Sequence, residues 1–521
     1  MRRRSFLQTS GVTSLGLTVP ASTSAAGRSA GPSDRSTLAS AQESYEPLGR
    51  VSVEGAAEAV LGDDGAVAYL AATTGFAIVD VSDSEEPELL AEERAIDVDG
   101  APVLQILDVK VDDEMLIVPG PANRGSDEFF HGFLRYDVSD PADPRAIGEP
   151  YETGTHIHNC YLDGEVLYVV ANDTDENPLV VYDVGGEVVE EIGRWSLLER
   201  EPGWRDVDWL ARYLHDVYVH DDVAYLAHWN AGTYLLDVGD PAEPEYLSHV
   251  SDTDLESQRE MDDDRDARLG LPGNDHYAAV DETGDLLAVG REAWATGGDE
   301  PDGPGGIDLY DVSDPTEPAF RATIDAPRAA DERYYGPLWT TAHNFELRDG
   351  DLYASWYQGG VTIHDVSDPA EPTERASWRD PETAAFWTAR VADPGETFVA
   401  SSTPAIPHGL TDGALYTFPI RTGEQADQPS LTDLDALEFE DDTGAGENES
   451  SNGSGSDGTG ASTNSTDGSA EASSNAEDDG ASGGVDRTPG FTAGGTVGLV
   501  GGVAALEWFR RRPRENDRGR P

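Results

Sequence analysis

The segment Phe76-Ala77-Ile78-Val79-Asp80-Val81-Ser82-Asp83 is the first copy of a phrase that returns along the chain. Later copies keep the same order, an apolar run followed by Asp, Val and a turn, and they begin at Leu134, Leu179, Tyr234, Ile307 and Val361. Each Asp lies 46 to 74 residues after the Asp of the copy before it. A degenerate seventh copy at 414–419 lacks the Asp-Val pair. Repetition at this period is typical of architectures that stack one supersecondary unit many times.

Each unit contains four short runs rich in β-branched and aromatic residues, with turn residues between them. In one unit, the runs 215–219 and 223–227 flank Asp221-Asp222, and Gly232 comes before the next run. An Asp-Pro turn follows several copies of the phrase, and Pro cannot donate to a β-ladder, so the turn separates the third run from the fourth. Four such runs predict a four-stranded antiparallel sheet.

The repeat therefore predicts an all-β fold, a seven-bladed β-propeller over residues 45–420. Residues 46–53 match the fourth run of a unit, while the last unit stops after its third run near Ile420. We expect the N-terminal strand to complete the last blade, which would leave the ring without an open edge. Six blades is the alternative, because the unit at 386–420 lacks the Asp-Val signature.

The repeated phrase resembles the LVIVD-repeat family of β-propellers, and the resemblance covers the whole repeat region. It implies the propeller fold and leaves the activity open, since propellers include both binding proteins and enzymes.

The composition is strongly acidic. The 521 residues include 102 Asp and Glu against 34 Lys and Arg, a formal net charge of −68, and Lys110 is the only lysine. This charge excludes a general binder of nucleic acids or anionic membranes, because both would be repelled. The acid excess is similar to that of haloarchaeal proteins, in which hydrated carboxylates maintain solubility in molar salt. Cys160 is the only cysteine, so no intramolecular disulfide can form.

The N-terminus has the features of an export signal over residues 1–26. Arg3-Arg4 precede Phe6-Leu7 and a mildly apolar stretch, and Ser24-Ala25-Ala26 supply small residues for cleavage. The pattern resembles a twin-arginine signal. We therefore expect the protein to be exported to the outer face of the cell envelope.

The C-terminal region predicts a stalk and an anchor. Residues 425–488 form an acidic Ser/Gly/Thr-rich stretch that is expected to be disordered. Residues 489–512 begin with Pro489-Gly490-Phe491, continue as an apolar run and end in arginines. This resembles the PGF-CTERM sorting signal of haloarchaeal surface proteins, which implies a transmembrane helix or a replacement lipid, with 513–521 as a cytoplasmic tail. Glycosylation sequons begin at Asn172, Asn448, Asn452 and Asn464.

Histidines recur at one position of the repeat. Alignment of the units places His158, His215, His276 and His343 at the start of the first run in four consecutive blades, and Glu58, Leu107 and Trp387 stand there in the other three. His131, His228 and His408 fall on connections between second and third runs, and His156 lies two residues before His158. Antiparallel alternation brings all these positions to one face of the ring.

Two interpretations of the four histidines remain open. Imidazoles that converge on a propeller axis could bind a transition metal such as copper, zinc or iron, because neutral His is the commonest metal ligand. Alternatively, His-Asp or His-Asn is part of the repeat's structural template, and each imidazole bonds to a neighbouring loop.

Aromatic residues surround the same face. Trp229, Trp356 and Tyr357 lie on connections between second and third runs. The long inserts add Trp204, Trp209, Trp294, Tyr334, Tyr335 and Trp339. An aromatic rim around a polar well suits a small molecule, a glycan or a protein ligand.

The sequence thus supports two classes of function. The first is a monomeric, surface-anchored module that binds a ligand or partner through the face rich in His and aromatic residues. The second is an extracellular metal-dependent enzyme, either a hydrolase or an oxidoreductase similar to methanethiol oxidases, with His-bound metal. No phosphate-binding loop, Gly-x-Ser-x-Gly elbow or Cys-x-x-Cys pair is present, so we assign no catalytic residue.

Overall fold

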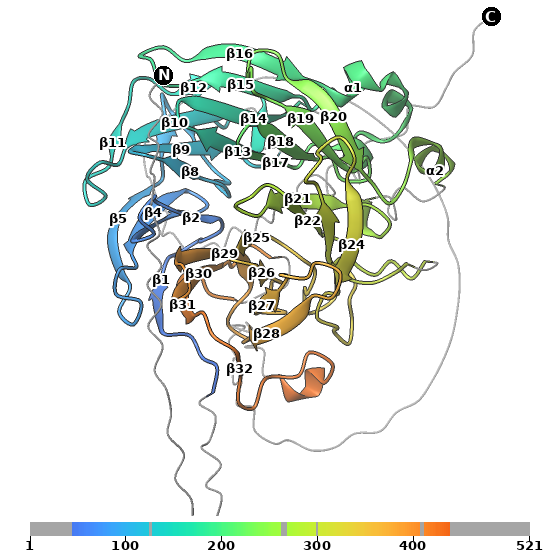
Figure 1. Ribbon diagram of the computed structural model, residues 1–521. Coiled ribbons are helices and arrows are strands. Elements are labelled where there is room, and N and C mark those ends of the chain that lie inside the picture. The colour runs from blue at the N-terminus through green and yellow to red at the C-terminus, as the bar shows by residue number, and fades with distance from the viewer. Residues whose placement is uncertain are drawn as a thin grey trace, which may run out of the picture. The chain divides into compact units, whose positions relative to one another are not determined.

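Seven antiparallel sheets form a closed ring in the computed structural model, so the predicted seven-bladed propeller is confirmed. The structure describes residues 44–123, 128–173, 175–261, 268–298, 301–406 and 411–437. Figure 1 shows the first strand of each blade near the middle of the ring and the fourth near its periphery. The predicted export signal (1–26), the anchor (489–512) and the tail (513–521) lie outside the described residues.

The blades share one strand order, from the axis outward. The innermost strands are β2 (Ala59–Leu61), β8 (Lys110–Asp112), β13 (His156–Asp163), β17 (Asp216–His220), β21 (Asp275–Val280), β25 (Phe345–Arg348) and β29 (Phe386–Asp393). The second strands are β3 (Val67–Ala71), β9 (Met115–Gly120), β14 (Val166–Asn172), β18 (Val223–Ala227), β22 (Leu286–Arg291), β26 (Asp351–Ser355) and β30 (Thr397–Ser402).

The third strands carry the repeated phrase. They are β4 (Gly75–Asp80), β10 (Gly132–Asp137), β15 (Leu179–Asp183), β19 (Thr233–Asp237), β23 (Ile307–Asp311), β27 (Val361–Asp365) and β31 (Ala414–Pro419). The outer strands are β5 (Glu88–Arg94), β11 (Arg145–Ala146) with β12 (Tyr151–Glu152), β16 (Glu190–Trp195), β20 (Glu245–Val250), β24 (Ala319–Ile324), β28 (Thr373–Trp378) and β1 (Gly49–Ser52).

The Asp of the repeated phrase ends the third strand by capping its own turn. Asp80 Oδ1 accepts hydrogen bonds from the backbone N–H and the hydroxyl of Ser82, at 2.9 and 2.6 Å. Asp137, Asp311 and Asp365 repeat both bonds with the serine two residues later. These bonds lower the pKa of each of the four carboxyls. The phrase is therefore a turn signal that fixes where the chain leaves the third strand.

The ring is closed by the N-terminal strand, as the sequence predicted. Strand β1 pairs antiparallel with β31 and completes the blade of β29, β30 and β31. Tyr45 lies just before β1, is 1% exposed, stacks on Phe418 and donates to the carbonyl of Pro419 at 2.9 Å. Trp378 of the neighbouring blade donates to Glu46 at 2.9 Å. One blade is thus built from both ends of the propeller.

The folded body continues past residue 420, where we expected the propeller to end. Strand β32 (Gly423–Glu424) pairs in parallel with β28, Leu431 is 3% exposed, and the carbonyl of Leu431 accepts from Ala330 N–H at 3.0 Å. The first residues of the predicted stalk, 425–437, therefore pack against the propeller. The remainder of the stalk lies outside the described residues.

The inserts between strands carry short elements. A hairpin of β6 (Asp97–Val98) and β7 (Ala101–Pro102) follows β5. The helical segments are α1 (Leu197–Arg200), η1 (Pro202–Asp206), η2 (Trp209–Arg212), α2 (Leu255–Glu260) and η3 (Leu434–Ala436). None of the helices in the described ranges has the length and apolarity to span a membrane.

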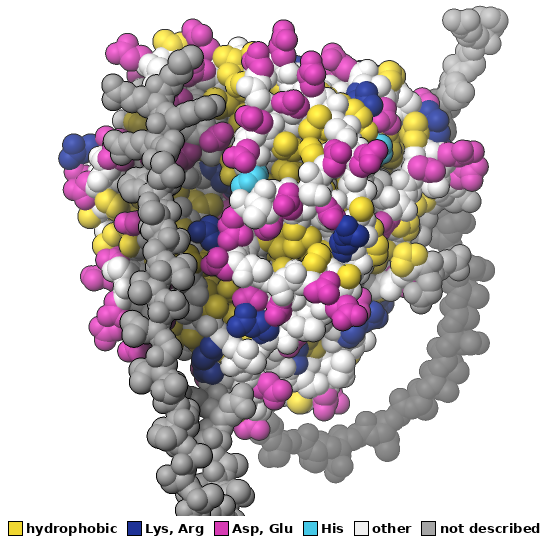
Figure 2. All heavy atoms as spheres, viewed as in Figure 1, with side chains coloured by type: hydrophobic (Ala, Val, Ile, Leu, Met, Phe, Trp, Pro, Cys, Tyr) yellow, Lys and Arg dark blue, Asp and Glu magenta, His cyan; other side chains and the backbone are white. Residues whose placement is uncertain are grey.

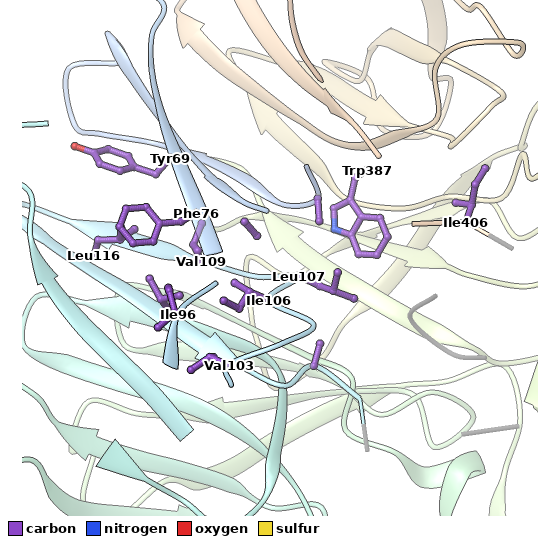
Figure 3. Packing of buried hydrophobic residues seen from close by; sticks show 14 of the residues in the cluster. Tyr69, Phe76, Ile96, Val103, Ile106, Leu107, Val109, Leu116, Trp387 and Ile406 are labelled. Carbon is purple, nitrogen blue, oxygen red and sulfur yellow. The ribbon is translucent and has the colours of Figure 1, made fainter. Parts of the chain in front are cut away.

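The core consists of apolar layers between blades. In the largest cluster, Phe76, Ile106, Leu116 and other residues of the first two blades reach Trp387 of the last one. Figure 3 shows Leu107 and Trp387 of this cluster entering from different blades. Carboxylates are spread over the face visible in Figure 2, with few arginines among them.

The ring closure predicts a large effect of one substitution. Tyr45→Ala should lower the free energy of unfolding by about 3–5 kcal/mol, because it removes from the closing blade a fully buried aromatic ring and its hydrogen bond to the carbonyl of Pro419. Chemical denaturation at constant high salt measures the change. Tyr335→Ala is the matched control, since Tyr335 is 63% exposed, and its effect should stay within about 0.5 kcal/mol. Equal effects of the two variants would contradict the role of Tyr45.

Candidate functional site

The strand pairing shifts register near the start of three innermost strands. The pairing of β13 with β14 shifts register between Ile157 and Cys160, and that of β21 with β22 shifts between Asp275 and Tyr277. The strand β29 shifts likewise between Phe386 and Thr388. These bulges contain His158, His276 and Trp387. A bulge re-aims the side chain of the extra residue, and all three of these residues line one pocket. His215 and His343 line the same pocket without a bulge in their strands.

The structure brings the four predicted histidines together as a continuous arc. Ring centroids are 4.1 Å apart for His158 and His215, 3.9 Å for His215 and His276, and 4.6 Å for His276 and His343. Trp387 extends the arc at 4.2 Å from His343. The alignment of the repeats therefore identified true neighbours from positions almost two hundred residues apart.

Three of these imidazoles are oriented by neighbouring blades. Nδ1 of His158 lies 3.0 Å from the carbonyl of Ala122, Nδ1 of His215 lies 3.0 Å from that of His276, and Nδ1 of His343 lies 2.6 Å from that of Trp387. A carbonyl only accepts, so Nδ1 carries the proton and Nε2 keeps its lone pair. The Nδ1 atoms of these three rings therefore bond to neighbouring blades, as the structural interpretation of the histidines expects. Their Nε2 atoms can still bind a ligand.

Burial keeps the histidines neutral. It lowers the pKa of His158 to about 4 and that of His343 to about 3, and it lowers the pKa of His215 and His276 well below the ordinary value. Neutral imidazole is the form that binds metals.

Ligand atoms suited to a metal come together at His276, His343 and Glu292. One such atom from each residue lies within 4.8 Å of the other two. His276 Nε2 is 3.4 Å from Glu292 Oε2, and the Nδ1 of His276 has no hydrogen-bond partner. Of the four predicted histidines, His276 and His343 belong to this group among the described residues, whereas His158 and His215 do not. A metal centre at the four histidines stays a prediction.

Glu292 is a buried carboxyl with one strong donor. Its side chain is 11% exposed, and the hydroxyl of Tyr357 donates to Oε1 at 2.5 Å. Burial raises the pKa of Glu292 to about 8. A carboxyl held in this environment is mostly protonated at neutral pH, and a bound metal ion would displace that proton.

A small pocket opens beside this group, and we call it the axial pocket. Its wall includes the four histidines, Glu292, His156 and a set of aromatic residues: Trp209, Tyr213, Trp229, Trp294, Tyr334, Tyr357 and Trp387. Its free volume is about 50 Å³, which accommodates a few water molecules or an ion with its waters. A glycan would not fit into this space.

The accessory residues separate into two groups. His156, Trp229 and Tyr357 line the axial pocket. Trp229 and Tyr357 have positive φ angles, and each forms an isolated bridge to the innermost strand of the next blade, which holds its ring over the axis. His228 and Trp356 are instead fully buried in blade packing: His228 Nδ1 lies 3.3 Å from the Arg212 carbonyl, and Trp356 donates to Thr362.

The remaining accessory predictions have mixed outcomes. His131 is partly exposed and does not line the axial pocket. His408 lies outside the described residues. Of the six aromatic residues on the inserts, Trp209, Trp294 and Tyr334 line the pocket, Trp204 and Trp339 are buried beside it or elsewhere in the core, and Tyr335 is exposed.

Asn172 is corrected as a glycosylation candidate. Its side chain is 1% exposed, its amide donates to the carbonyl of Leu214 at 2.8 Å, and its oxygen accepts from the backbone N–H of His158 at 3.0 Å. The amide nitrogen is therefore inaccessible in the folded protein and serves to hold the start of β13. The sequons at Asn448, Asn452 and Asn464 lie outside the described residues.

Sequence reasoning missed Glu292, although a signal was present. Glu292 follows the second strand of its blade directly, as His228 and Trp356 follow β18 and β26. From the sequence alone, only histidines and aromatic residues of this connection are taken as candidates. A carboxylate at this position, in a repeat whose first run starts with histidine, is an equally good candidate metal ligand, because Asp and Glu also bind metals.

Comparison with protein families supports the repeat. The LVIVD repeat family model matches residues 64–92, 211–252 and 352–380, so the chain carries LVIVD repeats. No curated protein matches the chain.

Among solved structures, the β-propeller domain of Cps50 (Swd1) from Myceliophteria thermophila has a TM-score of 0.48 and 9% identity, covering 71% of this chain and 99% of its own. The computationally designed Ika8 protein has a TM-score of 0.41 at 9% identity, covering 73% and 100%. A functionally unknown protein from Desulfotomaculum acetoxidans has a TM-score of 0.40 at 10% identity, covering 60% and 83%. These similarities carry no argument about function.

The buried histidines predict acid-sensitive stability. His228 is 0% exposed and burial lowers its pKa from 6.5 to about 4. Between these pH values the unfolded state binds a proton that the native state does not, so stability falls as the pH falls. From pH 7 to pH 5, the wild type should lose about 2 kcal/mol more unfolding free energy than His228→Gln. Denaturant titrations at both pH values measure this difference, and equal losses in the two proteins would contradict it.

Proposed function

We propose that the protein is a ligand-binding propeller whose axial pocket holds a divalent transition-metal ion through His276, His343 and Glu292. The observation that carries this proposal is the approach of one ligand atom from each residue to within 4.8 Å of the others. The three side chains come from two blades that are neighbours in the ring.

The surroundings of the group favour a metal site over a simple buried cluster. The hydrogen bond from His343 Nδ1 to a carbonyl, and the one from Tyr357 to Glu292, are the outer contacts that fix a ligand's tautomer and orientation. Two imidazoles and one carboxylate suit Zn²⁺, Fe²⁺ or Cu²⁺ rather than Ca²⁺ or Mg²⁺, which prefer oxygen ligands.

The binding role includes a ligand that completes the metal's coordination. Three protein ligands would leave at least one position open, and all three residues line the same pocket as the aromatic residues. The free volume of about 50 Å³ restricts such a ligand to a few non-hydrogen atoms unless an aromatic residue moves.

A metal-dependent enzyme is the second candidate. The specific observation in its favour is the same count of three protein ligands, which is usual for catalytic zinc sites, whereas structural zinc sites have four. A hydrolase or an oxidoreductase of this kind would act on a small molecule, because the free volume of the axial pocket is only about 50 Å³. The aromatic wall would exclude bulk water from the reacting atoms.

The metal site is tested by titration of chelator-treated protein with Zn²⁺ and, for its visible spectrum, Co²⁺. We expect one equivalent to bind. Glu292→Gln and His276→Gln should each weaken affinity by more than about 100-fold, since even residues that only orient a ligand contribute about 10- to 100-fold.

The matched control for the titration is His156→Gln, which changes a histidine of the same pocket outside the proposed ligand set and should leave affinity within about threefold. Circular dichroism verifies that each variant is folded. Absence of saturable binding, or affinity unchanged in both Glu292→Gln and His276→Gln, would overturn the proposal.

The proposal includes a location outside the cell membrane of a haloarchaeon. It rests on the Arg3-Arg4 pair, the Pro489-Gly490-Phe491 motif and the acidic composition. We infer that Arg3→Lys together with Arg4→Lys abolishes export, because twin-arginine signals require the pair. Fractionation of the native host, with immunodetection of the envelope and cytoplasmic pools, measures the effect. An unchanged distribution would contradict the twin-arginine route.

A further inference from the structure

A second and larger pocket lies at the other end of the axis, and we call it the lower pocket. Its free volume is about 400 Å³, within the size range of small-molecule sites. His215 and His276 line the axial pocket, whereas the residues that follow them, Asp216 and Tyr277, line the lower one. The same innermost strands therefore contribute consecutive residues to the two pockets.

Asp216 is a buried carboxylate without a bonded cation. It is 2% exposed, and its Oδ1 has no hydrogen-bond partner. Two cations of the same pocket act on Asp216 electrostatically, but each is already paired with another carboxylate. Lys110 pairs with Asp108, and Arg390 donates to Glu58 at 2.8 Å. Burial raises the pKa of Asp216 well above its ordinary value, so the carboxyl is protonated unless a ligand supplies a counter-charge.

The charges around the lower pocket favour a cation. Its lining includes four carboxylates, Asp216, Asp281, Glu282 and Glu346, and three cations, Lys110, Arg348 and Arg390. The buried carboxylates of Glu58 and Asp108 lie behind Arg390 and Lys110. Low-dielectric walls focus this negative excess into the cavity.

Tyrosines from consecutive blades form the apolar part of the wall. Tyr161 of β13, Tyr218 of β17 and Tyr277 of β21 all line the lower pocket. The rings of Tyr161 and Tyr218 are 5.2 Å apart in an edge-to-face arrangement, and both residues are partly exposed to the cavity. The face of a tyrosine ring attracts a cation, most strongly where water is excluded.

We propose that the lower pocket is a second ligand site, which binds a small organic cation with an ammonium group between Asp216 and the rings of Tyr161 and Tyr218. An ammonium with carbon substituents matches both features, because its charge pairs with the carboxylate and its alkyl groups contact the rings. A bare inorganic ion would leave most of the cavity unfilled. This site is independent of the metal proposed for the axial pocket.

The test uses tetramethylammonium as the probe and tert-butanol as its neutral analogue, with the full folded chain in constant KCl. Saturation-transfer NMR should show saturable binding of tetramethylammonium and none of tert-butanol. Asp216→Asn should weaken binding by at least about tenfold, since it removes the carboxylate that pairs with the ammonium group. Tyr218→Leu should weaken it by about fivefold, the effect of losing one ring face.

Asp206→Asn is the matched control, because Asp206 is 68% exposed on η1 and pairs with Arg259 at the surface. It should leave the affinity unchanged. If Asp216→Asn fails to fold, Tyr218→Leu at the pocket mouth decides. Absence of tetramethylammonium binding, equal binding of tert-butanol, binding of inorganic cations only, or affinity unchanged in the folded Asp216 and Tyr218 variants would each overturn the proposal.

Discussion

The closure of the ring is the constraint on which every site in this protein depends. Strand β1 pairs with β31, so the last blade cannot form until both ends of the repeat region have met. Once the ring is closed, the seven innermost strands must share one axis, and their first residues must meet at one end of it. The histidine arc, the axial pocket and the lower pocket all follow from that geometry rather than from local sequence.

Closure also gives the buried polar groups two functions at once. His158, His215 and His343 each connect their blade to a neighbour through Nδ1, and each presents Nε2 to the axis. The same bonds that stabilise the blade junctions therefore orient the imidazoles. For this reason the structural and the functional interpretations of the repeated histidine do not exclude one another.

The fold could be predicted well from the sequence because it depends on short sequence motifs that repeat and act locally. The Asp-Val-Ser turn determines where a third strand ends, and its copies can be counted without knowledge of the tertiary structure. The closing strand was predictable because the last unit lacks a fourth run. The boundary near residue 420 was less accessible, because the pairing of β32 with β28 is short and depends on a contact between segments far apart in the chain.

The site was predicted in part, for a similar reason. Repeat alignment placed His276 and His343 side by side, but it could not show that Glu292 would approach them more closely than His158 and His215 do. Asn172 illustrates the opposite error, since its sequon is local and its burial against Leu214 is not. Asp216 and the tyrosines of the lower pocket have no motif at all, and only the arrangement of adjacent blades relates them.

The position of the single lysine has a practical consequence for chemistry on this protein. Lys110 is the only lysine in the chain, and it lines the lower pocket against Asp108 with a side chain that is 13% exposed. Reagents that acylate primary amines, and proteases that cut after lysine, therefore find no ε-amino group on the outer surface of the folded propeller. Acylation of Lys110 would report the opening of the lower pocket. A label could be attached elsewhere through carboxylates or an introduced cysteine.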